Sequence, residues 1–361
     1  MANSKQEELQ VELRKLVDST IEVSHNLFFD YDKVVNGEDS ENTARYTSPD
    51  TLEALGKLLS HDATKLSLAC KPPVDDAAPG IKVCQSLAEN TAKLVAHASQ
   101  PILETSTGKE VSFEGLGGKT LASEVQAVVQ KILSSVASLA NSFLDSPVQL
   151  EAEASQHGFL VSSGKLWESC DMIPKLSHNN RDAVKKRWKE LEELLLDVAN
   201  EFSEMISNTD DDEEGEDEGE EFDDGWGEIL GDVKFSKSEK QIAQNFHSLL
   251  APTRLLYRKV LKRGIEECPL KTQEQVNWLD TVLDVGKATL EQADEIGSAL
   301  WEHQPEQSII SRISDFNGKI SELINVATMY VESEEHTQWY AKLSEKYAKT
   351  FETVLNSNSP R

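Results

Sequence analysis

Residues 118–145 read GKTLASEVQAVVQKILSSVASLANSFLD, and their apolar side chains recur at steps of three and four from Leu121 to Phe143. This spacing places the apolar side chains on one face of an α-helix, because an α-helix has about 3.6 residues per turn. The same period recurs through most of the chain, and no segment of strand length alternates convincingly between apolar and polar residues. The sequence therefore predicts an all-α protein in which each apolar face is covered by another helix.

Proline and glycine divide the periodic segments into about ten long helices. Long helices joined by short turns pack as antiparallel bundles. Three of the helix starts carry capping signals: Ser48 precedes Pro49, and residues 238–241 and 272–275 both fit a capping box. The expected helices are residues 5–36, 48–70, 80–105, 118–145, 149–172, 178–208, 236–263, 272–302, 306–333 and 337–356.

Residues 210–224 (DDDEEGEDEGEEFDD) carry twelve carboxylates and no basic side chain. Like charges this close together repel one another and stay solvated, so we expect a disordered acidic linker. A division of the chain at this run leaves six helices and four, whereas a division at the Ile173-Pro174 helix stop leaves two bundles of five. We favour the second division, with an N-terminal bundle at 1–175 and a C-terminal bundle at 178–358 that contains the acidic insertion at 209–232.

The chain has 64 acidic and 36 basic residues and a net charge of −28, of which about −16 lies outside the acidic run. Proteins that bind nucleic acid usually carry a positive footprint that neutralises phosphates, so direct binding to nucleic acid or to an anionic membrane is not expected. No run of about 18 apolar residues occurs, and the N-terminus lacks the apolar stretch of a signal peptide. Basic proteins such as histones remain an alternative class of partner for the acidic run.

No catalytic, cofactor or metal site is expected. The eight histidines show no metal-ligand spacing, and the chain lacks a GxSxG nucleophile elbow. The four scattered cysteines form no CxxC pair, which is typical of reduced, buried thiols in a protein of cytoplasm and nucleus. Residues 114–120 (EGLGGKT) look like a phosphate-binding loop, but Phe113 stands where the first glycine is required, so a glycine turn before a helix is the better interpretation. The acidic run also matches part of an EF-hand loop, and we attribute this match to its composition.

Residues 222–230 (FDDGWGEIL) contain the better candidate for a binding motif. Trp226 and Ile229 are spaced W-x-x-I and follow Asp223 and Asp224, which resembles the short motifs that bind ubiquitin-like autophagy modifiers by strand addition. These four residues are therefore candidate partner-binding side chains of an autophagy or trafficking adaptor. In the alternative interpretation, Trp226 and Ile229 pack back onto the bundle and tether the end of the linker.

The only dense basic stretch is residues 181–189 (RDAVKKRWK). A basic region of this kind can lie in the major groove of DNA. Here, however, Val184, Trp188 and Leu191 give the same helix an apolar stripe, and acidic residues follow immediately. The stretch is more typical of a solvated helix face whose cations pair with acids one turn further on.

Residues 166–183 read LWESCDMIPKLSHNNRDA. They resemble the cyclin-D-binding protein 1 family, also described as the human homologue of maternal Id-like molecule and as Grap/cyclin-D-interacting protein. Segments 52–73 and 119–139 resemble further helices of the family, so the resemblance extends over most of the chain. Ser177 stands where animal members tend to have a second proline. The residues that match the family pattern are Trp167, Cys170, Ile173, Pro174, Asn180, Arg181 and Ala183.

The resemblance implies an all-helical protein of nucleus and cytoplasm, without enzymatic activity, that binds cyclin D and helix-loop-helix transcription factors and restrains the cell cycle. It assigns no cyclin-binding residue and leaves the oligomeric state open. Trp167 and Cys170 fall where one face of a helix would bury them, so we expect them to pack in the core as structural residues. The predicted function is a noncatalytic adaptor that regulates cell-cycle or transcription proteins by offering helix grooves to partner helices.

Overall fold

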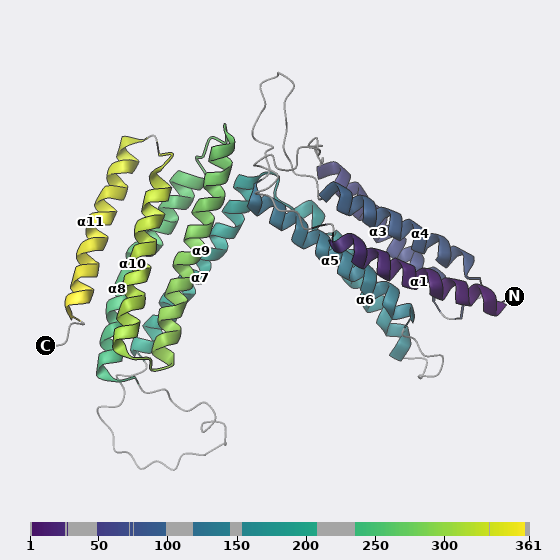
Figure 1. Ribbon diagram of the computed structural model, residues 1–361, viewed down its shortest axis with the longest axis horizontal. Coiled ribbons are helices and arrows are strands. Elements are labelled where there is room, and N and C mark those ends of the chain that lie inside the picture. Colours follow the sequence, from purple (N-terminus) through teal and green to yellow (C-terminus); the bar gives the residue numbers. More distant parts are fainter. Residues whose placement is uncertain are drawn as a thin grey trace, which may run out of the picture. The chain divides into compact units, whose positions relative to one another are not determined.

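The computed structural model describes residues 2–25, 27, 49–71, 73–74, 76–98, 118–144, 154–207, 235–331 and 333–357. Over these residues the protein is all-α, as predicted, with ten α-helices and no strand (Figure 1). The chain divides into two compact units, Met1–Ala183 and Val184–Arg361, and the boundary falls inside a helix. The acidic run and the residues around it lie outside the described part of the chain.

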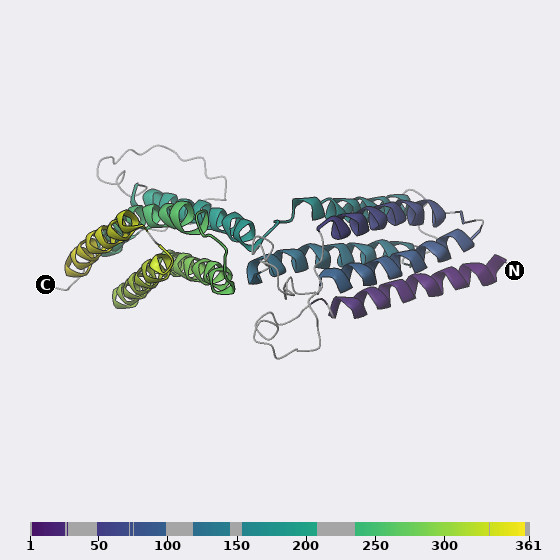
Figure 2. The same cartoon turned by 90° about the horizontal axis from the view of Figure 1, so that it is seen from above.

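The first unit is a bundle of five helices that close around one core (Figure 2). Helix α1 packs against α4 and α5, α4 packs against α3, α3 packs against α6, and α6 packs against α5. A 3₁₀ turn at Ile173–Lys175 follows α6 and packs against α3. The helices are α1 (Ala2–His25), α3 (Pro49–Ala69), α4 (Ala78–Ala98), α5 (Lys119–Leu144) and α6 (Ala154–Cys170).

Helix α5 is the most apolar of these helices, and it agrees closely with the helix expected at 118–145. Its stripe from Leu121 to Phe143 is buried in the core of the first unit. By length and composition alone, α5 would also be able to cross a membrane. Since its apolar stripe packs against neighbouring helices, α5 is accounted for as a core helix of the bundle.

The second unit contains five helices, the first of which enters from the first unit. Helix α9 packs along α10, α8 packs against α11, and α10 contacts both α8 and α11. Helix α8 continues directly into a π-helical turn at Val260–Ile265. The helices are α7 (Asn180–Ser207), α8 (Lys237–Lys259), α9 (Gln273–Trp301), α10 (Glu306–Thr328) and α11 (Glu334–Ser357).

A buried tryptophan joins α7 to α8 and α9. The indole N–H of Trp188 donates a hydrogen bond to the Tyr257 carbonyl at 3.1 Å, and the two rings lie 5.0 Å apart. The Tyr257 hydroxyl in turn donates to the Gly286 carbonyl at 2.6 Å. A Cβ atom on Gly286 would lie 2.5 Å from the Trp188 ring, so glycine is what allows the indole to pack this closely. Further along the same helices, the rings of Phe202 and Phe246 lie 5.0 Å apart.

Several helix ends differ from the sequence-based expectation. Helix α8 is capped by Ser236 instead of by the box at 238–241: the Ser236 side chain accepts from the Glu239 N–H, and the Glu239 carboxylate accepts from the Ser236 N–H. The cap at Thr272 is confirmed, because its side chain accepts from the Gln275 N–H. Helix α1 ends at His25, before the expected residue 36, and is followed by a turn at Leu27. The expected helices 80–105 and 149–172 correspond to α4 and α6 over the described residues, and residues 99–105 and 149–153 lie outside them.

Candidate partner-binding groove

The tryptophan of the family pattern lies at the surface of the first unit. Trp167 is 38% exposed, and its indole N–H donates to the Ser60 carbonyl of α3 at 3.2 Å. The expectation that Trp167 packs in the core is therefore wrong, whereas Cys170 is buried as expected. Residues three apart on a helix differ by about 60° around its axis, which here moves Trp167 from the core face to the edge beside α3.

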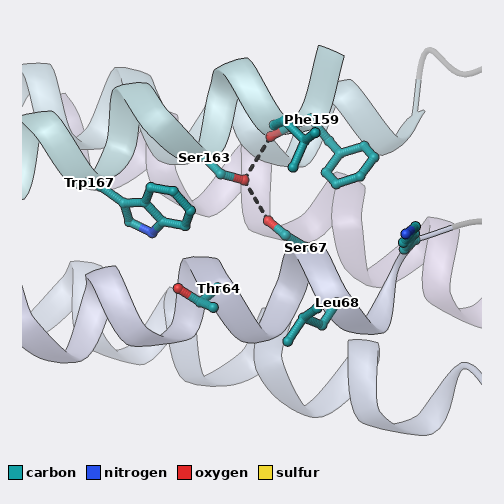
Figure 3. Close-up of a pocket in the computed structure, with 8 residues that line it drawn as sticks. Thr64, Ser67, Leu68, Phe159, Ser163 and Trp167 are labelled. Atoms are coloured by element: carbon teal, nitrogen blue, oxygen red, sulfur yellow. Dashed lines mark hydrogen bonds between the residues drawn. The ribbon is translucent and has the colours of Figure 1, made fainter. Parts of the chain in front are cut away.

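Trp167 borders a groove between α3 and α6. A depression of about 240 Å³ lies between Trp167 and Phe159 of α6 and Thr64 and Leu68 of α3 (Figure 3). A second depression of about 340 Å³ shares Thr64 and continues toward Pro174 of the family pattern. The two depressions adjoin at Thr64 of α3, and we call them together the α3–α6 groove.

The groove is hollow because small side chains line most of α3. On α3, Gly56, Ser60, Thr64 and Ser67 border it at steps of four, four and three residues. A Cβ atom on Gly56 would lie 2.6 Å from the Ile173 side chain, so the 3₁₀ turn can approach α3 only at a glycine. The hydroxyl of Ser67 forms a hydrogen bond with that of Ser163 across the floor (Figure 3). This bond holds the two helices together without filling the space above them.

Large apolar side chains stand exposed at one end of the groove. Leu68 of α3 is 73% exposed and Leu160 of α6 is 52% exposed, and both line the smaller depression. Val161, the next residue on α6, is 57% exposed. Exposed apolar side chains around a concave surface are typical of sites that bind another protein or a ligand.

Charged side chains of both signs stand at the rim. Lys71 lines the apolar end, and Asp171 lines the other depression. Lys57 forms an ion pair with Glu53 one turn away on α3. An apolar centre with a polar rim is the usual anatomy of a protein–protein interface. The groove thus resembles half of such an interface.

The family-pattern asparagine has a structural role at the start of α5. Asn180 is fully buried, and its side-chain oxygen accepts from the Leu121 N–H at 3.0 Å. A Cβ atom on Gly118 would lie only 2.1 Å from the Asn180 amide nitrogen, so this glycine leaves room for the capping side chain. Lys119 begins α5, so the end of the EGLGGKT segment is a helix start, and residues 114–117 lie outside the described residues. A phosphate bound at this helix terminus would accept hydrogen bonds from its free backbone N–H groups. Here the Asn180 carboxamide already accepts one of them, the Leu121 N–H.

Two further residues of the pattern, Pro174 and Arg181, lie in the 3₁₀ turn after α6 and in the first turn of α7. Pro174 lies in the 3₁₀ turn at the end of the groove. The Arg181 Nε is buried and has no hydrogen-bond partner among the residues that the structure describes. The neighbouring Asn179 caps α7, since its side-chain oxygen accepts from the Asp182 N–H at 2.9 Å. The pattern therefore marks a connection between helices as well as one end of a groove.

The basic stretch at 181–189 is a helix face, as predicted. Val184 and Trp188 are fully buried, whereas Lys189 is exposed. Arg187 forms an ion pair with Glu190 on the next turn at 2.9 Å. Lys185 pairs with Glu266, beyond the π-helical turn, also at 2.9 Å.

All four cysteines are free and buried, and burial raises the pKa of the thiols of Cys70, Cys84 and Cys170 to about 12. Such thiols are almost entirely protonated at neutral pH and are poor nucleophiles. Within the described ranges, no three His, Cys, Asp or Glu side chains are grouped so that they could hold a metal ion.

The candidate binding residues Trp226, Ile229, Asp223 and Asp224 lie outside the described residues, as does the acidic run at 210–224. The autophagy-type motif and the binding of basic proteins therefore stay predictions. The sequence analysis did not identify Leu68 and Leu160 as site residues. The small residues at steps of four, four and three on α3 were the signal that could have indicated a groove.

Two family models match the chain. Residues 51–208 match a model described as Grap2 and cyclin-D-interacting, N-terminal, and residues 209–325 match one described as Grap2 and cyclin-D-interacting, C-terminal. Both walls of the α3–α6 groove lie almost entirely within the first match.

Three relatives are similar over most of their length. A cyclin-D1-binding protein 1 homolog of Danio rerio is 22% identical over 340 residues, which cover 90% of this chain and 90% of the relative. One of Xenopus laevis is 26% identical over 264 residues, covering 69% of this chain and 71% of the relative. An uncharacterized protein of Schizosaccharomyces pombe is 22% identical over 299 residues, covering 82% and 83%.

Proposed function

The chain belongs to the Grap2 and cyclin-D-interacting family, and from this premise we propose that it is a noncatalytic regulator that binds a D-type cyclin through the α3–α6 groove. The observation that carries the proposal is the pair Leu68 and Leu160, which stand exposed on opposite walls of a concave surface beside Trp167. The names of the vertebrate relatives support the class of partner.

The dimensions of the groove suit a helix of the partner. Its lining on α3 runs from Glu53 to Leu68, which corresponds to about 22 Å at a rise of about 1.5 Å per residue. An amphipathic helix of similar length would lie along it and insert apolar side chains spaced three and four residues apart. Leu68 and Leu160 would contact the first of these anchors, and the shared wall at Thr64 would contact the next.

A helix-loop-helix regulator would offer a similar apolar helix face, so we propose that such a partner competes with the cyclin for the same groove. Competition of this kind would make the protein an adaptor between cell-cycle and transcription proteins. The four free, buried cysteines suit the reducing conditions of cytoplasm and nucleus, where these partners act.

The test is calorimetric titration of the full chain and its Leu68→Glu variant with purified cyclin D1. Leu68 is exposed in the free protein, so the substitution should not disturb folding. Burial of a leucine side chain contributes about 1.5–3 kcal/mol, and a buried carboxylate costs more. The variant should therefore bind at least about tenfold more weakly, since about 1.4 kcal/mol corresponds to a factor of ten in Kd.

The matched control is Leu58→Glu, on the same helix. Leu58 is 49% exposed and lines neither depression, so its variant should bind within about twofold of the original chain. Equal weakening by both substitutions, or none by Leu68→Glu, would show that the groove does not receive the cyclin. Failure of the unchanged chain to bind cyclin D1 at micromolar concentration would instead overturn the class of partner.

A further inference from the structure

We propose that a basic surface on the second unit binds a carboxylate-rich peptide segment of a partner protein. This basic surface consists of side chains from α7, from α8 and from the π-helical turn. Its members are Lys185, Lys189, Arg254, Arg258 and Lys262.

The sign of the charge reverses locally along α8. Between Glu239 and Glu266 the chain has no carboxylate side chain, although acidic residues outnumber basic ones 64 to 36 in the whole chain. Arg254 and Arg258 are exposed and lie four residues apart, which places them on the same face of the helix. Lys262 follows after another four residues and is also exposed.

Helix α7 brings further cations to the same place. Lys185 forms ion-pair contact with Glu266 at 2.9 Å, and Lys262 contacts the same carboxylate at 3.1 Å. Glu192 of α7 interacts electrostatically with Arg258 and Lys262 as well as with Lys189 of its own helix. Cations that are about seventy residues apart in the sequence therefore share one surface.

The cations are only partly neutralised. Glu266 forms ion pairs with two of the five cations, Lys185 and Lys262. Arg254 and Arg258 form no ion pair with another residue of the described ranges. Burial raises the pKa of Glu192 in spite of the nearby cations, which indicates that this carboxylate is partly withdrawn from water.

An apolar side chain stands among the charges. Leu255 is 54% exposed, and it lies on α8 between Arg254 and Arg258. Positions 254, 255 and 258 fall within an arc of about 100° around the helix axis. A leucine flanked by arginines fits a peptide in which an apolar residue stands between carboxylates. The Leu255 side chain would contribute little to binding the phosphate backbone of a nucleic acid, which presents no apolar side chain to contact it.

The charge of the whole chain also favours a peptide. Nucleic acid and anionic membranes are extended arrays of negative charge, and a protein with a net charge of −28 repels them at long range. A short acidic peptide contacts only the local positive surface. At physiological ionic strength the repulsion from charges beyond about 8 Å is largely screened.

The test uses fluorescence anisotropy with a fluorescein-labelled helical peptide of glutamate, alanine and leucine, in which each leucine is flanked by glutamates four residues away. The full chain should bind this probe, and binding should weaken as sodium chloride is raised. The double variant Arg258→Glu, Lys262→Glu should bind at least about tenfold more weakly. Both side chains are exposed, so the variant should remain folded.

The control is Lys342→Glu, Lys349→Glu on α11, which changes the net charge by the same amount at two other exposed lysines. It should bind the probe within about twofold of the original chain. Equal loss in the two double variants would overturn the proposal, since net charge alone would then explain binding. Tighter binding of duplex DNA or of phosphatidylserine vesicles, lost in the Arg258→Glu, Lys262→Glu variant, would also overturn it.

The chain's own acidic run is the remaining possible occupant. The probe should therefore also be titrated into a chain that lacks residues 210–224. The same ranking of the variants is expected there. If deletion strengthens binding of the probe to the original chain but not to the Arg258→Glu, Lys262→Glu variant, the surface serves the acidic run, and the proposal of a partner peptide fails.

Discussion

Replacing Asn180 by alanine should destabilise the first unit by about 2–4 kcal/mol. Asn180 is fully buried, and its side-chain oxygen accepts the Leu121 N–H at 3.0 Å. Loss of this capping hydrogen bond costs at least about 1 kcal/mol. The cost rises to as much as about 3 kcal/mol because the Leu121 N–H is then buried without a partner. The space left by the carboxamide adds about 1 kcal/mol.

A second substitution separates this cap from general loss of packing. Gly118→Ala places a Cβ atom 2.1 Å from the Asn180 amide, so it should destabilise the original chain. In the Asn180→Ala background the carboxamide is absent, and the same change should cost much less. The double-mutant cycle should therefore give a coupling free energy of at least about 1 kcal/mol.

Amide hydrogen exchange read by mass spectrometry on the intact chain measures both effects. Peptides from α5 should exchange about 30 to 1,000 times faster in Asn180→Ala, because each 1.4 kcal/mol of opening free energy is about a factor of ten. Peptides from α9, in the second unit, serve as the internal reference. Exchange of α5 within threefold of the original chain, or additive effects of the two substitutions, would refute the assignment of Asn180 as the cap of α5.

Three further predictions concern packing, pH and thiol reactivity. Gly286→Ala should lower the Tm, because the new Cβ would lie 2.5 Å from the Trp188 ring and this clash outweighs the helix preference of alanine, about 1 kcal/mol. Gly318→Ala, in open space on α10, should raise the Tm. The opposite order of the two Tm values by calorimetry would contradict the packing. Burial alone would raise the pKa of Glu239, but Ser236 and His303 hold it below its ordinary value. The Glu239 carboxylate therefore stabilises the fold above about pH 4.3, and this stabilisation is lost as the pH falls through the lowered pKa. The free energy of unfolding in urea, measured from about pH 3 to 6, should depend less on pH in Glu239→Gln. An unchanged pH dependence in this variant would contradict the assignment. The buried thiols should react with a disulfide reagent only as the protein unfolds, so labelling of the native chain within seconds would disagree with the structure.

Local patterns predicted the helices, because an apolar stripe is a property of neighbouring residues. Helix α5 was expected at 118–145 and runs from Lys119 to Leu144. The capping box of α8 was placed two residues late, at 238–241, because Ser236 and Ser238 are each followed three residues later by a side chain able to complete such a box. The structure uses Ser236, whose partner Glu239 is a carboxylate and a stronger acceptor than the amide of Gln241.

The site depends on which helices meet, and a single helix does not contain that information. Trp167 has the spacing of a core residue, but the position of α3 leaves it at a surface groove. Asn180 caps a helix that begins about sixty residues earlier in the chain, so no local motif would connect the two. The basic stretch on α7 was correctly interpreted as a solvated face, yet its association with Arg258 required the packing of α8 beside it.

Hydrogen exchange on the complex with cyclin D1 tests most directly whether the α3–α6 groove is the partner site. We predict slower exchange in peptides that cover residues 64–71, at the end of α3 and just beyond it, and residues 159–167 of α6. Exchange should be unchanged in α1, which lines neither depression of the groove. The same protection should be lost in Leu68→Glu and kept in Leu58→Glu. Protection confined to other helices, with residues 64–71 and 159–167 unchanged in a saturated complex, would contradict the account.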